Sequence, residues 1–125
     1  MHFGFLIFPE LEELDLVGPW EMMTNWSKYF HGPECIMIAE HREPVVCSKG
    51  MIITPHVTFT DCPELEYLLI PGGMGTWKEV DNPALIRFVV DKTAECKALL
   101  SVCTGSFILH RAGLLAGQEF RFRQL

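Results

Sequence analysis

The stretch Leu99-Leu100-Ser101-Val102-Cys103-Thr104-Gly105-Ser106 decides how this chain folds. A buried strand that runs directly into a small-residue turn and then a helix is the pattern of a nucleophile elbow, which lifts one side chain above the edge of a sheet. Here that side chain is Cys103, and the N-terminus of the following helix favours its thiolate form. The alternative is a buried core cysteine, because free cysteine is among the most buried residue types.

Outward from this stretch, strand and helix patterns alternate along the chain. Short apolar runs typical of strands buried on both faces cover residues 3–8, 35–39, 67–70 and 98–102. Helical patterns cover 11–29, 82–95 and 104–116, with Gly117 just past the last one, and a hairpin joins 44–47 to 51–54. The sequence therefore predicts one α/β domain over residues 1–125, with an open, mainly parallel sheet and helices on both faces.

Composition and charge narrow the class of protein. Of 125 residues, 49% are hydrophobic, which suffices for a buried core, and the net charge of −6 argues against nucleic-acid binding. No apolar run approaches the roughly 20 residues that span a bilayer, and the N-terminus lacks signal-peptide features, so we expect no membrane contact. The five cysteines are irregularly spaced without a CxxC pair, which predicts no metal site, no disulfide framework and a cytoplasmic location.

A glycine-rich turn follows the third predicted strand, at the sheet edge where sites of parallel sheets gather. In Pro71-Gly72-Gly73-Met74-Gly75 the backbone N–H groups of Gly72 and Gly73 can turn toward Cys103. Together with the N–H of Thr104 they would form an oxyanion hole. The alternative is an ordinary strand-ending turn, which has the same composition.

A carboxylate is expected at the same edge, after the first strand. The segment Leu14-Asp15-Leu16-Val17-Gly18-Pro19 places Asp15 low in the cleft, where it can exchange a proton with Cys103 or a bound water. A first-turn or N-capping acid of the following helix is an equally good interpretation. The neighbouring acids Glu10, Glu12 and Glu13 are expected to be solvated.

No histidine is well placed to act as the base of a Cys–His dyad. His110 lies two turns into the helix after Cys103 and points away from the elbow, and His56 is expected at the surface. The sequence therefore argues against a protease-like mechanism.

Several motifs in matching order resemble the DJ-1/PfpI superfamily, and in particular its isonitrile hydratase branch. They are Phe5-Leu6-Ile7-Phe8-Pro9, Leu14-Asp15-Leu16-Val17-Gly18-Pro19, Asp61-Cys62-Pro63, Ile70-Pro71-Gly72-Gly73 and Ser101-Val102-Cys103-Thr104-Gly105-Ser106. The resemblance implies a flavodoxin-like fold that usually forms homodimers. It also implies a small-molecule substrate and no metal or organic cofactor.

The resemblance further implies roles for individual residues. Cys103 would be the nucleophile and Asp15 the carboxylate beside it, while Thr104 stands where the protease-like branch has a histidine. Pro9, Gly18 and Pro19 would border the substrate. In the hydratase branch an isonitrile, R–N≡C, is hydrated to an N-substituted formamide.

The C-terminal segment departs from the family. Its members continue after Ala-Gly-Leu-Leu-Ala-Gly with a strand that opens on Thr-Thr-His-Trp, whereas this sequence reads Gln-Glu-Phe-Arg-Phe-Arg-Gln-Leu over 118–125. We therefore expect a domain cut short after about residue 117, with apolar surface left open to association.

Three alternatives to hydration follow from the same resemblance. Some superfamily members are glyoxalases or deglycases, although that branch usually carries a glutamate at the position of Asp15 and a histidine near the cysteine. Others are sensor modules of transcription regulators, which predicts ligand binding or oxidation of Cys103 without turnover. The last alternative is an inactive remnant.

Overall fold

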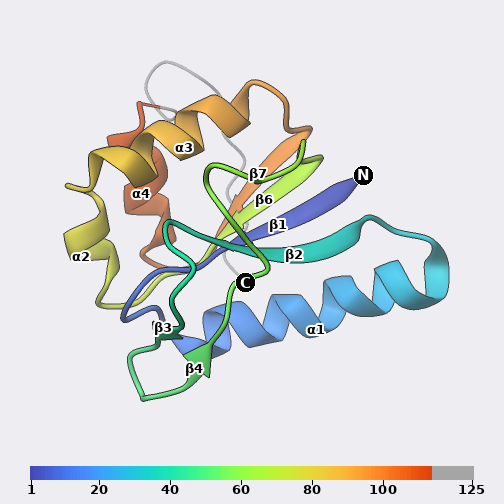
Figure 1. Cartoon of the computed structure of the whole chain (residues 1–125), viewed down its shortest axis with the longest axis horizontal. Helices are drawn as coiled ribbons and strands as arrows, with labels where there is room; N and C mark the ends of the chain where they lie inside the picture. Colours follow the sequence, from blue (N-terminus) through green and yellow to red (C-terminus); the bar gives the residue numbers. More distant parts are fainter. Residues whose placement is uncertain (114–125) are drawn as a thin grey trace.

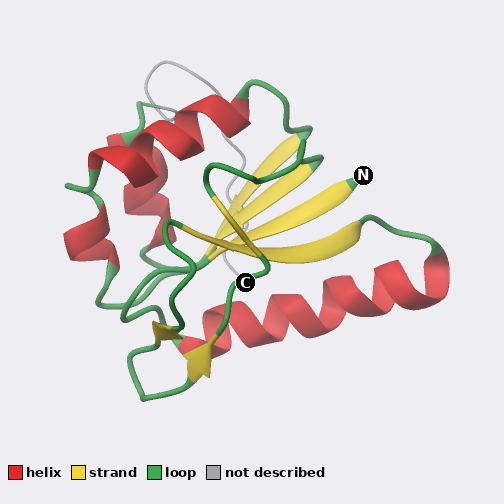
Figure 2. Ribbon diagram, viewed as in Figure 1, coloured by secondary structure: helices red, strands yellow, loops and turns green. Residues whose placement is uncertain are grey.

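A five-stranded parallel sheet forms the centre of the fold in this computed structural model, which describes residues 1–113 (Figures 1 and 2). The strand order is β5-β2-β1-β6-β7, and every pairing between neighbours is parallel. The strands are β1 (His2–Leu6), β2 (Glu34–Ala39), β5 (Val57–Thr58), β6 (Tyr67–Ile70) and β7 (Ala98–Ser101). The predicted parallel α/β sheet is confirmed.

The central strands are buried because both of their faces are covered. Phe5 and Leu6 of β1 are fully buried, as are Leu68 and Ile70 of β6. Continuous apolar runs of this kind are what a strand needs when helices lie on both sides of a parallel sheet. The buried centre fixes where the carboxyl ends of β1, β6 and β7 lie, and the candidate site is built on those ends.

Helices lie on both sides of the sheet (Figure 1). The helix α1 (Glu13–Phe30) covers one face, while α2 (Thr76–Glu79), α3 (Pro83–Thr93) and α4 (Gly105–Arg111) lie on the other. Trp20 of α1 packs edge-on against Phe5 of β1 with ring centroids 5.0 Å apart. Within residues 1–113, no helix has the length and apolar character needed to cross a bilayer.

The predicted hairpin is also confirmed. Strands β3 (Val45–Val46) and β4 (Ile52–Ile53) pair antiparallel, with Val45 opposite Ile53 and Val46 opposite Ile52. The hairpin docks onto the loop after β1, because Glu10 N–H donates to the carbonyl of Val46 at 2.9 Å. It therefore lies beside the start of α1 (Figure 1).

Three local features differ from the sequence prediction. The short elements β5 and α2 were not predicted, because two and four residues are too few to show a periodic pattern. The last helix was predicted to reach residue 116, but α4 ends at Arg111, and Gly113 takes a left-handed φ of 77° soon after it. Gly117, predicted to follow this helix, lies outside the described residues.

Candidate active site

Three chain segments meet at the carboxyl edge of the sheet in direct backbone contact. They are residues 9–12 after β1, 71–75 after β6 and 102–105 after β7. Gly73 has a φ of 119°, and a Cβ there would overlap the backbone nitrogen of Glu12. A Cβ on Gly105 would likewise overlap the carbonyl oxygen of Ile70. Only glycine permits this approach, which brings the side chains of the three loops together.

Cys103 occupies the predicted elbow between β7 and α4. Its φ is 49°, a left-handed conformation that costs a non-glycine residue about 1–3 kcal/mol and is held only by the surrounding structure. The thiol is free and the residue is exposed. The alternative interpretation of a buried core cysteine is therefore wrong.

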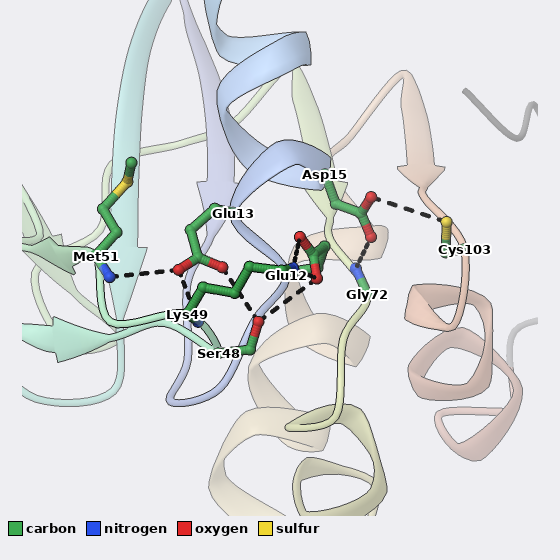
Figure 3. A network of polar contacts seen from close by, with 8 residues as sticks. All are labelled: Glu12, Glu13, Asp15, Ser48, Lys49, Met51, Gly72 and Cys103. Carbon is green, nitrogen blue, oxygen red and sulfur yellow. Dashed lines mark hydrogen bonds and ion pairs between the residues drawn. The ribbon is translucent and has the colours of Figure 1, made fainter.

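Asp15 lies beside the thiol, in the first turn of α1 (Figure 3). The distance from Cys103 Sγ to Asp15 Oδ1 is 3.8 Å, within reach of a weak S–H···O hydrogen bond. The N–H of Gly72 donates to the other carboxylate oxygen, Oδ2, at 3.2 Å. This second bond fixes the orientation of the carboxylate toward the cysteine.

Burial and charge shift the pKa values of Cys103 and Asp15. Desolvation raises the pKa of the Cys103 thiol, and the negative charge of Asp15 raises it further. The pKa of the Asp15 carboxyl is also raised, chiefly by desolvation. The prediction that the elbow lowers the thiol pKa is wrong, because a carboxylate 3.8 Å away disfavours a second negative charge. The raised pKa of Cys103 favours the neutral thiol.

Thr104 ties the glycine turn to the elbow. Its Oγ1 accepts a hydrogen bond from the N–H of Gly73 at 3.0 Å and another from Thr76 Oγ1 at 3.1 Å. The N–H groups of Gly72 and Gly73 are thus occupied by Asp15 and Thr104, so the predicted oxyanion hole of Gly72, Gly73 and Thr104 is not formed by the two glycines. Among the described residues, nothing accepts a bond from the backbone N–H of Thr104.

The three residues expected to border the substrate lie in different places. Gly18 and Pro19 follow Asp15 by three and four residues on α1, on the same side of the helix. Gly18 has open space where a Cβ would be, whereas Pro19 is buried. Pro9 lines a cavity whose walls include neither Cys103 nor Asp15, and its place beside the substrate stays a prediction.

An ionic network beside Asp15 was not predicted from the sequence (Figure 3). Lys49, at the tip of the hairpin, pairs with Glu12, and its backbone N–H donates to Glu13 Oε2 at 2.8 Å. Ser48 Oγ donates to Glu13 Oε1 at 3.1 Å. Glu12 and Glu13, expected to be solvated, are partly exposed and in addition anchor the hairpin to the start of α1. The sequence held no signal for this, because the partners are more than 30 residues apart.

No histidine of residues 1–113 hydrogen-bonds to Cys103. His56 stacks on Trp20, and its Nδ1 accepts from the N–H of Met37 at 2.8 Å. His110 is an exposed residue of α4. Nor do His, Cys, Asp and Glu side chains gather anywhere in this part of the chain in a group of three that could hold a metal ion.

Comparison with known proteins agrees with this arrangement. The family model described as the DJ-1/PfpI family matches residues 2–120. The chain belongs to the DJ-1/PfpI family. It is 33% identical to an isonitrile hydratase from Pseudomonas putida over 95% of this chain and 50% of that protein. The likeness predicted from the motifs is confirmed at the level of the family.

Two further relatives place the chain within the family. The crystal structure of a THiJ/PfpI family protein from Pseudomonas syringae has a TM-score of 0.86 and 36% identity, covering 93% of this chain and 47% of that one. A glutathione-independent glyoxalase from Caenorhabditis elegans is 25% identical over 89% of this chain and 59% of that protein. The chain thus spans about half the length of its relatives.

Proposed function

We propose that the chain carries the catalytic pair of a hydratase, which adds water to an isonitrile and releases an N-substituted formamide. The observation that carries this proposal is the thiol of Cys103 at 3.8 Å from the carboxylate of Asp15, with no histidine beside it. A thiol paired with a carboxylate suits a substrate whose carbon must receive both a nucleophile and a proton. The likeness to an isonitrile hydratase supports the same chemistry.

In the first step the S–H bond of Cys103 adds across the terminal carbon of the isonitrile. Asp15 accepts the thiol proton, the sulfur forms a bond to the carbon, and Asp15 returns the proton to that same carbon. The product is a covalent thioimidate, R–N=CH–S–Cys103, and no atom is left over. A resting thiol with a raised pKa, already aimed at a carboxylate, is the correct starting state for this transfer.

In the second step water adds to the thioimidate carbon. Asp15 takes a proton from the water and passes it to the substrate nitrogen. As the C–S bond breaks, the hydroxyl proton of the adduct returns through Asp15 to the sulfur, which releases R–NH–CHO and the Cys103 thiol. Developing negative charge is stabilised by the backbone N–H of Thr104. The hydroxyl of Thr104 acts as a positioning group, since it holds the Gly73 turn against the elbow.

The proposal is tested by incubating the protein with cyclohexyl isonitrile and following N-cyclohexylformamide by gas chromatography. We expect formamide from the wild type, none above background from Cys103→Ala, and wild-type yields from Cys35→Ala, which removes a thiol of β2. Folded protein that makes no formamide contradicts the proposal, and so does undiminished formation by Cys103→Ala.

A second candidate is glyoxalase or deglycase chemistry, in which Cys103 adds to a carbonyl carbon. The likeness to the glyoxalase of Caenorhabditis elegans supports it, at lower identity. Against it stands Thr104, which supplies no imidazole at the elbow. Methylglyoxal consumed with lactate release, dependent on Cys103 and without isonitrile hydration, would replace the first proposal with this one.

Assembly is proposed to be homodimeric. Apolar side chains remain exposed on the face of α2 and α4, where Trp77 and Phe107 lie with ring centroids 5.1 Å apart. Exposed apolar patches of this kind favour association. Light scattering after size exclusion tests this, with twice the monomer mass expected and a monomer contradicting it.

A cytoplasmic location remains a prediction of the cysteine content. All five cysteines are free thiols in the structure. Free thiols persist in a reducing compartment. Microscopy of the tagged chain tests the prediction.

A further inference from the structure

A cavity that includes neither Cys103 nor Asp15 lies at the carboxyl ends of β1 and β2. It has a volume of about 310 Å³, at the lower end of the range of small-molecule pockets, roughly 300–1,000 Å³. Its walls come from the segments after β1 and β2, from β3, and from the end of α2 and the start of α3. Phe8, Val45 and Leu85, all buried, form its apolar part.

Two carboxylates that line this cavity, those of Glu40 and Glu79, share one amide donor. Glu79 is only 7% exposed, and Asn82 donates from Nδ2 to both Glu79 Oε1 at 3.3 Å and Glu40 Oε1 at 2.8 Å. The Asn82 side-chain oxygen is used as well, because it caps α3 by accepting from the N–H of Ala84. Within residues 1–113, no donor reaches Glu79 Oε2.

The charges around Glu79 leave its carboxylate poorly compensated. Burial raises the pKa of its carboxyl, and the charge of Glu40 raises it further. The other ionisable groups at the cavity are Glu43, Lys78 and His41. Lys78 forms no ion pair with Glu79, and His41 lies 3.4 Å from Glu40 Oε2. Three glutamates and a single lysine therefore line the cavity, and Glu79 Oε2, which no donor of the described residues reaches, is available to a ligand.

We propose that this cavity binds a small organic ammonium ion, whose N–H groups donate to Glu79 Oε2 and Glu40 and whose hydrocarbon part packs on Phe8 and Leu85. A bare metal ion fits less well, because the described residues contain no group of three His, Cys, Asp or Glu side chains placed to hold one, and much of the wall is apolar. The site needs neither Cys103 nor Asp15. It therefore stands whether or not the chain hydrates isonitriles.

The probe is n-butylammonium, followed at neutral pH by two-dimensional NMR of the full chain. We expect saturable binding in the millimolar range, with shift changes at the Asn82 side-chain amide and the Leu85 methyls. Glu79→Gln, which keeps the shape and removes the charge, should weaken binding about tenfold or more. Glu64→Gln, an exposed acid outside the cavity, should leave binding unchanged.

Other outcomes overturn the proposal. If butanol binds as well as butylammonium, the positive charge is not recognised. If tetramethylammonium binds as well as butylammonium, the N–H donors are not recognised. Equal binding by Glu79→Gln, or shift changes only around Cys103, would place the ligand elsewhere. If Glu79→Gln does not fold, Glu40→Gln takes its place with the same expected loss. No saturable binding by folded wild type also contradicts the proposal.

Discussion

Replacement of Asp15 by asparagine should speed alkylation of the Cys103 thiol and slow the proposed isonitrile hydration. The carboxylate lies 3.8 Å from the sulfur and raises the pKa of the thiol, so its removal lowers that pKa and increases the thiolate population at neutral pH. Two unit charges about 4 Å apart in a water-like environment repel by about 1 kcal/mol. Because Cys103 is exposed, this screened value applies, and it corresponds to a roughly fivefold faster alkylation of the thiol.

The same substitution should abolish the transfer of the proton to the substrate. Loss of a positioned general acid–base lowers rates by about 10²–10⁴-fold, so formamide formation should fall by at least 10²-fold. The assay compares iodoacetamide alkylation of Cys103, read by mass spectrometry, with isonitrile hydration in the same preparation. Asp91→Asn, an exposed aspartate on α3, is the matched control and should change neither rate. Slower alkylation in Asp15→Asn would refute the thiol–carboxylate resting state.

Further predictions concern stability. Gly105→Ala should lower the free energy of unfolding in urea by about 1–3 kcal/mol, because its Cβ would meet the Ile70 carbonyl. Gly18→Ala, with open space around it, should raise that free energy by roughly 0.5–1 kcal/mol. Equal effects of the two substitutions would contradict the packing described. Thr104→Val should cost about 1–3 kcal/mol, because it leaves the Gly73 N–H unpaired, and should slow hydration; an unchanged Tm and rate would contradict its role. Desolvation holds the pKa of each cysteine other than Cys103 at about 11 against an ordinary 9.0, so the unfolded chain loses these protons first. Stability should therefore fall as pH rises from 9.0 toward about 11, and a constant Tm over that window would contradict it.

The fold was largely predictable because its strands are continuous apolar runs. The strand β6 was predicted with its observed ends, and the helix predicted from residue 82 begins at Pro83. The elbow at Cys103 was predictable because strand, turn and helix are adjacent in the sequence. Short elements such as β5 lack such a local signal, since a neighbouring strand and not a pattern of their own defines them.

The electrostatics of the site could not be predicted from the sequence. The pKa of Cys103 depends on the approach of Asp15, which lies 88 residues away along the chain. From the motif alone, the N–H groups of Gly72 and Gly73 were expected to be available for an oxyanion hole. Their acceptors lie far away in the sequence, in α1 and at the elbow. The cavity around Glu79, assembled from several loops and helices, likewise has no local signature in the sequence.

The central claim is that Cys103 forms a covalent bond to the substrate carbon with the help of Asp15. The most direct test is acid quenching during turnover of an alkyl isonitrile, followed by mass spectrometry of the intact chain and its peptides. We expect a transient gain equal to the mass of one isonitrile, located on Cys103 and absent from Cys103→Ala. Turnover without such an adduct, with formamide still produced by Cys103→Ala, would contradict it.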